Sequence, residues 1–137
     1  MSFSELEART VVRSVGEFHV GTDGSTSLLR VALDFGDGAL VTLASASDGQ
    51  SLQVGSEVLR DYDMERYGRT EIRELGLPTG AHVREAVPMV DADGLTFGVL
   101  LRAEERDVFV FSWGDDLYAQ ESLPAYVRAA CTTPLPV

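Results

Sequence analysis

The chain has 137 residues, and its 22 acidic residues against 11 basic ones give a formal net charge of −11 at pH 7. A field of this sign repels nucleic-acid phosphates and anionic membrane surfaces, so we expect neither as a partner and favour a basic protein partner instead. With 45% hydrophobic residues the chain is too apolar for disorder, and its length fits a single domain, residues 1–137, with its own core.

The first part of the chain predicts a helix and then an antiparallel meander. Ser4 to Glu7 match a helix capping box, so a short helix is expected there. β-Branched and aromatic residues become frequent over residues 11–20, and apolar residues alternate with polar ones from residue 29 to 35. Further strands are expected at residues 40–43 and 52–54, which makes this segment a three-strand meander.

Residues 55–80 interrupt the pattern, and within them residues 61–68 are expected to form a short helix or turn that ends at Gly68. One or two helical turns are expected after Leu123. Between these segments, strands are expected at residues 82–90, 97–102, 108–113 and 117–119. Asp-Gly pairs lie between apolar runs, as hairpin turns do, and begin at Asp23, Asp37, Asp48 and Asp93.

The two strand-rich stretches, residues 10–54 and 81–120, match each other in order. Asp23-Gly24 corresponds to Asp93-Gly94 at an offset of 70 residues. The other matched positions are Val12 with Val83, Val31 and Leu33 with Val99 and Leu101, Val41 and Leu43 with Phe109 and Phe111, and Leu52 with Leu117. Any two meanders with Asp-Gly turns can align in this way, so an internal duplication and a coincidence both remain open.

Either interpretation gives the same fold class. We expect a mainly β chain, or β-rich α+β, in which two degenerate antiparallel β-meander units pack as a sandwich or a strongly bent sheet. Short helices lie at the periphery, and residues 55–80 connect the units. A single meander cannot bury its apolar face alone, so the two must pack together or share one sheet.

Catalytic and metal-binding motifs are missing from the sequence. Cys131 is the only cysteine, which excludes an intrachain disulfide and a multi-thiolate zinc site. His19 and His82 are too few for a catalytic zinc, and Asp91 to Gly94 opens like a calcium loop but lacks the later ligands, so it is interpreted as a turn. We therefore expect no enzyme, no metal and no other cofactor.

Charges and aromatic residues favour a binding role. Seven acids lie between Asp34 and Glu65 against one arginine, and Asp115-Asp116 occupies the turn that matches Asp48, so symmetric stacking would bring both turns to one acidic rim. Ordinary turn chemistry also places acids at turns. Tyrosine and tryptophan are enriched at binding hot spots. The candidate partner-binding residues are Asp34, Asp37, Asp48, Asp61, Asp63, Glu65, Trp113, Asp115, Asp116 and Tyr118.

Two segments of the chain resemble small acidic bacterial immunity proteins of polymorphic toxin systems. They are Asp34-Phe35-Gly36-Asp37-Gly38 and Ser112-Trp113-Gly114-Asp115-Asp116-Leu117-Tyr118, and the resemblance spans residues 28–120. It implies a protein that binds and occludes a cognate toxin, often a basic nuclease, by presenting carboxylates where the toxin expects phosphate. No functional residue is carried over from the resemblance.

Three functional hypotheses follow. The leading one is a non-catalytic acidic module that neutralises a basic toxin; we expect it in the cytoplasm, because the N-terminus carries acids and no apolar run reaches the ~20 residues of a membrane span. One alternative is a small-molecule-binding or enzymatic β-fold whose pocket lies between the units, lined by His19, His82, Tyr62 or Tyr67. The other is a homodimeric structural protein that pairs through a strand edge or the Trp113 region.

Overall fold

Two antiparallel sheets make up most of the protein. The computed structural model describes residues 2–36, 40–56, 68–75, 80–104 and 106–135, together with the backbone of residues 62–63. A short 3-10 helix, η1 (Phe3–Leu6), lies near the N-terminus and an α-helix, α1 (Ala125–Ala130), near the C-terminus. The strands are β1 (Arg9–Thr10), β2 (Arg13–Val20), β3 (Thr26–Asp34), β4 (Leu40–Ser45), β5 (Leu52–Gly55), β6 (Tyr62–Asp63), β7 (Arg69–Glu74), β8 (His82–Val90), β9 (Thr96–Ala103), β10 (Asp107–Trp113) and β11 (Asp116–Gln120).

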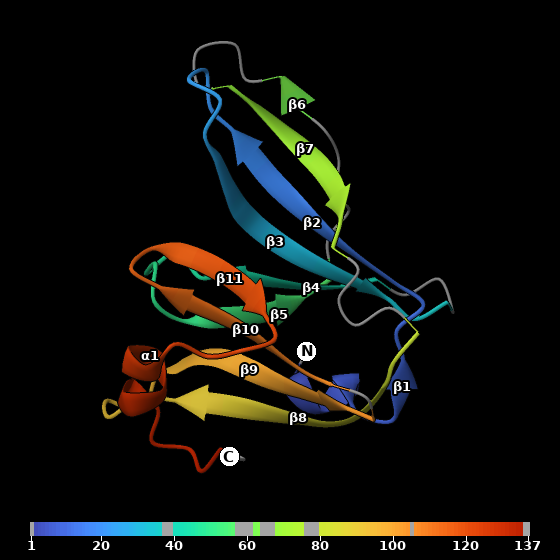
Figure 1. Ribbon diagram of the computed structural model, residues 1–137, viewed down its shortest axis with the longest axis vertical. Coiled ribbons are helices and arrows are strands. Elements are labelled where there is room, and N and C mark those ends of the chain that lie inside the picture. Colours follow the sequence, from blue (N-terminus) through green and yellow to red (C-terminus); the bar gives the residue numbers. More distant parts are fainter. Residues whose placement is uncertain are drawn as a thin grey trace.

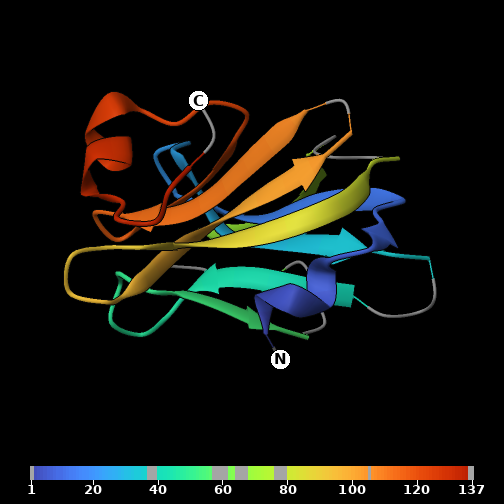
Figure 2. The same cartoon turned by 90° about the horizontal axis from the view of Figure 1, so that it is seen from below.

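The sheets stack as a β-sandwich, which confirms the expected fold class (Figures 1 and 2). Sheet A has the strand order β1-β8-β9-β10-β11, and sheet B has the order β5-β4-β3-β2-β7-β6. Each sheet therefore contains one four-strand meander, β2 to β5 in sheet B and β8 to β11 in sheet A. Among the described residues, no helix is long and apolar enough to cross a membrane.

The inter-sheet core is built by the period-two alternation of the strands. Val31 and Leu33 of β3 and Val41 and Leu43 of β4 are at most 2% exposed, and they form one cluster with buried residues of sheet A. The sheet A members include Val99, Leu101, Val108, Val110 and Leu117. Fully burying each such side chain is worth roughly 1.5–3 kcal/mol, so this layer supplies much of the driving force that joins the meanders.

Sheet A has a second buried layer on its outer face. Phe109 and Phe111 alternate with the core valines of β10 and pack with Met89, Leu100 and Val127, the last from α1. In Figures 1 and 2, α1 lies at the end of the sheet where β8 ends and β9 begins. Strand β10 is therefore buried on both faces, which explains its continuous apolar run from Val108 to Phe111.

Each meander is extended by a strand that precedes the other meander in the chain. Strand β1 precedes β2 but pairs with β8, with Arg9 opposite Val83. Strand β7 precedes β8 but pairs with β2, with Val15 opposite Glu74. The two halves of the chain thus exchange a strand with each other, and this exchange, together with the inter-sheet core, joins them into one unit.

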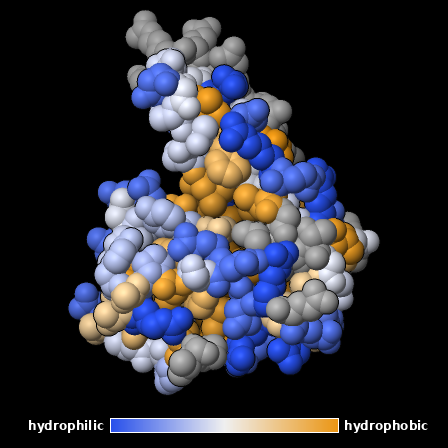
Figure 3. Space-filling view, in the orientation of Figure 1, coloured by the Kyte–Doolittle hydropathy of each residue, from blue (hydrophilic) through white to orange (hydrophobic). Residues whose placement is uncertain are grey.

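Sheet B continues beyond the sandwich as a projecting blade formed by β2, β7, β6 and the first half of β3 (Figure 1). Charged pairs cover part of it: across β2 and β3, Glu17 accepts hydrogen bonds from Arg30 Nη1 at 3.0 and 3.3 Å, and within β7 Arg73 pairs with Glu71 at 2.7 Å. Apolar side chains gather where the blade leaves the body (Figure 3).

Three local expectations are wrong. The expected short helix is present as the 3-10 helix η1, but Ser4 and Glu7 do not form a capping box: η1 has no side-chain cap, and the Glu7 carboxylate instead accepts the Ala86 N–H of β8 at 3.3 Å. Residues 62–63 are a strand rather than part of a helix or turn. Strand β7 was not expected, because charged residues dominate it, although Thr70 and Ile72 alternate with them.

The matched positions of the two meanders hold only in part. Val31 and Leu33 share the inter-sheet core with Val99 and Leu101, as do Leu52 and Leu117. Val41 and Leu43 face that core, but Phe109 and Phe111 face the outer layer, so the correct match for β4 is one residue earlier, Val108 and Val110. Val12 is 49% exposed while Val83 is fully buried. The internal duplication itself remains a prediction.

Candidate functional site

Three hairpin turns meet at one end of the sandwich. They join β4 to β5 (residues 46–51), β8 to β9 (residues 91–95) and β10 to β11 (residues 113–116). In an antiparallel meander successive turns alternate between the two ends of the sheet, so the β8–β9 and β10–β11 turns share one end of sheet A and the β9–β10 turn lies at the other. The β4–β5 turn of sheet B reaches the same end, because the Ser112 hydroxyl of β10 donates to the Gly49 carbonyl at 3.2 Å. We define the acidic turn face as Asp48, Asp91, Asp93, Asp115 and Asp116, which these turns carry.

The β10–β11 turn has the two-residue hairpin form that the twist of paired strands favours. Trp113 lies opposite Asp116, and the two residues between them, Gly114 and Asp115, have φ values of 58° and 69°. Aspartate tolerates this left-handed conformation better than most residues other than glycine and asparagine. The turn therefore presents two neighbouring carboxylates directly beside Trp113.

The other two turns use an aspartate as their internal hydrogen-bond acceptor. Asp48 accepts the backbone N–H groups of Gln50 and Ser51 at 2.9 and 2.8 Å, and these bonds with the Ser51 hydroxyl hold its pKa below the usual value. Asp91 Oδ1 accepts the N–H groups of Asp93 and Leu95 at 2.9 and 3.0 Å. Asp48 is therefore ionised at neutral pH, and both turns are held in one conformation.

A hydroxyl relay ties the two sheets together at this end. Ser45 Oγ donates to Ser112 Oγ at 2.9 Å, and Ser112 Oγ donates to the Gly49 carbonyl at 3.2 Å. Gly49 has a φ of 70°, and a side chain on it would overlap the Asp115 carboxylate. The absence of a side chain at Gly49 thus permits the close approach of two acidic turns that come from different sheets.

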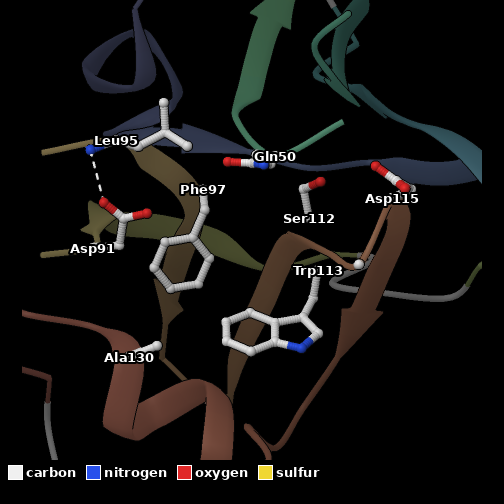
Figure 4. Close-up of a pocket in the computed structure, with 9 residues that line it drawn as sticks. Gln50, Asp91, Leu95, Phe97, Ser112, Trp113, Asp115 and Ala130 are labelled. Carbon is white, nitrogen blue, oxygen red and sulfur yellow. Dashed lines mark hydrogen bonds between the residues drawn. The ribbon is translucent and has the colours of Figure 1, made fainter. Parts of the chain in front are cut away.

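The turns surround a hollow of about 370 Å³. Trp113 and Phe97 form its aromatic floor, with ring centroids 6.1 Å apart in an edge-to-face arrangement, and Tyr126 of α1 lies on Trp113 at 5.7 Å. Figure 4 shows the Asp91 carboxylate on one side of these rings and the Asp115 carboxylate on the other. The described lining residues are Gln50, Asp91, Leu95, Phe97, Ser112, Trp113, Gly114, Asp115 and Ala130.

Positive charge is missing from this part of the described surface. None of the described lining residues of the hollow is an arginine or a histidine. The ion pairs of the described residues lie elsewhere and involve none of the five carboxylates of the acidic turn face. The carboxylates of Asp91 and Asp115 line a low-dielectric aromatic floor, and three more carboxylates lie on the same turns. Together they produce a local negative potential that attracts cations.

The structure brings together half of the candidate residues named from the sequence. Asp48, Asp115, Asp116 and Trp113 meet at the acidic turn face, and Tyr118 lies close by, where its ring stacks on Phe111 at 5.2 Å and is 38% exposed. The acidic stretch from residue 34 to 65 does not form one patch. Asp34 lies at the opposite end of β4 from Asp48, where its carboxylate accepts the Gly36 N–H at 2.8 Å.

The remaining candidates are not placed at this face. Asp37, Asp61 and Glu65 lie outside the described residues, as does the side chain of Asp63, whose backbone pairs with Arg69. The same holds for Tyr67 and the Tyr62 side chain. His19 lies on β2 opposite Thr70, whereas His82 lies on β8 of the other sheet and hydrogen-bonds Thr10 at 3.0 Å, so the histidines do not converge.

Sequence reasoning missed the lining residues Asp91, Phe97 and Gln50. Asp91 had been interpreted only as part of a turn; the signal that could have found it is parity, since every second turn of a meander returns to the same end. Phe97 could not be assigned to the site from the sequence, because its packing against Trp113 depends on an irregularity in the pairing of β8 with β9. That irregularity lies at Met89 and Val90 of β8, opposite the start of β9.

Within the described ranges, no three histidine, cysteine, aspartate or glutamate side chains are grouped as metal ligands would be. The site thus offers carboxylates, aromatic rings and one amide, which are groups that bind cations or basic side chains. Comparison with known proteins adds no relative, since no family model, no curated protein and no solved structure matches this chain.

Proposed function

We propose that this protein is a non-catalytic module that binds a basic protein partner through the acidic turn face. More specifically, we propose an immunity or inhibitor protein that neutralises a basic toxin domain in the cytoplasm of a bacterium. The observation that carries the proposal is an aromatic floor lined by the carboxylates of Asp91 and Asp115, on turns that also carry Asp48, Asp93 and Asp116, with no arginine among the described lining residues.

The physical basis is electrostatic steering followed by aromatic anchoring. Complementary charge raises association rates from a neutral ~10⁵–10⁶ M⁻¹s⁻¹ towards ~10⁸ M⁻¹s⁻¹ at low salt. Trp113 and Tyr118 are partly exposed beside the carboxylates, where a partner can bury them, and buried aromatic anchors slow dissociation. An occluding inhibitor needs both a fast encounter and a long residence time.

The proposal predicts that a neighbouring reading frame encodes a basic toxin domain, and the test uses that domain as the partner. Stopped-flow association is followed by Trp113 fluorescence between about 0.01 and 1 M salt, over which the Debye length falls from about 30 to 3 Å. We expect the association rate to fall steeply with salt. A rate that does not change with ionic strength, or the absence of binding, contradicts the proposal.

A charge-matched pair of triple variants locates the surface. The test variant carries Asp48→Asn, Asp115→Asn and Asp116→Asn. The control carries Asp23→Asn, Glu5→Gln and Glu104→Gln, which removes three exposed carboxylates away from the face. Because both variants change the net charge equally, we expect only the first to lose most of the salt dependence. Equal losses would mean that net charge, rather than this face, governs association.

A further inference from the structure

We infer that the hollow between the three turns receives the guanidinium group of one arginine side chain of the partner. This inference rests on the proposed function, because it specifies how the basic partner is held. The carrying observation is a concave site with an aromatic floor between two carboxylates, Asp91 and Asp115, rather than negative charge alone (Figure 4).

The size and floor of the hollow fit a planar cation. About 370 Å³ accommodates the end of one long side chain, but not a helix or a strand of the partner. The Trp113 indole ring is held between Phe97 at 6.1 Å and Tyr126 at 5.7 Å, so the floor is fixed before binding. Tryptophan offers the most favourable ring face for a guanidinium or ammonium group.

The polar rim supplies acceptors on both sides of that floor. Asp91 uses Oδ1 for the backbone N–H groups of Asp93 and Leu95, which leaves Oδ2 as an available acceptor. The Asp115 carboxylate and the Gln50 side-chain amide lie across the floor (Figure 4). Five N–H donors spread around a guanidinium plane can reach acceptors on opposite sides, whereas an ammonium group is a compact point charge.

The fold keeps the site open for a cation from outside. The nearest end of α1 contributes Ala130, which is too small to fill the hollow. The described Arg128 side chain lies over Phe109, at 6.0 Å from the ring centroid to Cζ, rather than over Trp113. Charge complementarity and the aromatic floor therefore select an arginine of a basic partner as the occupant.

Trp113 is the only tryptophan of the chain, so its fluorescence reports directly on this site. The probes are N-acetyl-arginine amide, N-acetyl-lysine amide and N-acetyl-citrulline amide, a neutral isostere of the first, each titrated into the intact protein. We expect a saturable change with the arginine probe, weaker binding of the lysine probe and no saturation with citrulline.

Two conservative variants test the rim. In Asp91→Asn the amide oxygen still accepts the turn N–H groups, and asparagine suits the left-handed conformation of residue 115 in Asp115→Asn, so both turns stay folded. Each is expected to weaken the arginine probe about fivefold, equivalent to ~1 kcal/mol. Glu104→Gln, at the opposite end of sheet A, is the control and should leave the affinity unchanged.

Several results would overturn the inference: a citrulline probe that binds as tightly as arginine, a lysine probe that binds as tightly or more tightly, or an equal loss in Glu104→Gln. If the arginine probe fails while the Asp48, Asp115 and Asp116 variant still slows association with the toxin domain, the hollow is not the arginine site and the proposed function stands. If the probe binds but no basic domain does, the proposed function fails instead.

Discussion

The two meanders share one topology and differ in what covers their outer faces. In the second meander, β8 to β11, the outer face carries Leu100, Phe109 and Phe111, which are buried under α1. At the corresponding face of the first meander, β2 to β5, lie Ala32, Thr42 and the Glu17–Arg30 pair. The second meander thus has a large aromatic and aliphatic outer layer, whereas the buried outer positions of the first, Ala32, Thr42 and Glu17, are small or polar, and that meander continues into a charged blade (Figure 1).

Because of this difference, the same meander topology has two structural roles in this protein. The apolar outer layer fixes β10 and α1 against each other, and it holds Trp113 and Phe97 in the floor of the hollow, with Tyr126 of α1 against Trp113. The first meander contributes the Asp48 turn and the inter-sheet core. The candidate site therefore lies where the rigid meander meets a turn of its partner.

The largest expected effect on the free energy of unfolding comes from truncating a side chain in the outer layer of the second meander. Phe111→Ala removes a side chain that is 1% exposed and packs in the outer cluster, so we expect a loss of about 3–5 kcal/mol in the free energy of unfolding. Leu29→Ala in the first meander removes a 38% exposed side chain and should cost less than ~1 kcal/mol. Chemical denaturation measures both; similar losses would contradict the difference in burial between these two side chains.

The next largest difference is expected when a methyl group is added to one glycine in each meander, Gly98 of β9 and Gly16 of β2. At Gly98 a Cβ would lie 2.7 Å from Phe111 Cβ and 2.9 Å from the Val110 carbonyl oxygen, neither of which can move freely. Gly98→Ala should therefore cost about 1–3 kcal/mol. At Gly16 the nearest atoms are the ends of Phe18, Leu28 and Leu75, so Gly16→Ala should cost less. If thermal or urea unfolding showed that Gly16→Ala loses more stability than Gly98→Ala, the surroundings of Gly16 would be the less able to adjust, which contradicts this prediction.

The charged pair of the first meander should respond asymmetrically. The Glu17 side chain is 4% exposed and the Arg30 side chain 35% exposed. Arg30→Ala leaves a buried carboxylate without this cation, whereas Glu17→Ala leaves an arginine that can reach water, so Arg30→Ala should be the more destabilising. We expect about 1–3 kcal/mol for Arg30→Ala by urea denaturation. If Glu17→Ala were the more destabilising variant, desolvation of the Glu17 carboxylate would not be the main cost when the pair is broken.

The smallest effect is a pH dependence at the tip of the blade. Asp23 accepts bonds from the hydroxyl and the backbone N–H of Ser25, which lower its pKa in the folded protein. A lowered folded pKa stabilises the protein above pH 3.8, and this contribution is lost as the pH falls through the folded value. The difference in Tm between wild type and Asp23→Asn should therefore shrink from pH 5 to pH 3.

The matched control is Asp93→Asn in the corresponding turn of the second meander. The Asp93 carboxylate accepts no hydrogen bond from the described residues, and only its backbone N–H takes part in the turn. Its Tm difference from wild type should stay nearly constant over the same pH range. A shrinkage as large as that of Asp23→Asn would show that bulk charge, rather than the Ser25 bonds, causes the effect.

Alternation and turn chemistry made most of the fold predictable. The alternating apolar residues of β3 and the Asp-Gly turns at Asp23, Asp48 and Asp93 mark hairpins whose strands need only local information. Strand β7 escaped prediction because four of its six residues are charged and because its partner, β2, lies about 50 residues earlier. Non-local pairing of this kind leaves little trace in a local pattern.

The candidate site could be predicted only as a list of acids together with Trp113 and Tyr118. The sequence by itself determined the net charge, the hairpin turns and the two meanders, because these depend on composition and on near neighbours. Only the tertiary structure decided which turns meet, since strand parity separates Asp34 from Asp48, and sheet packing sets the Asp48 turn beside Asp115 and Trp113. That packing depends on contacts between residues more than 60 positions apart, such as Ser45 with Ser112.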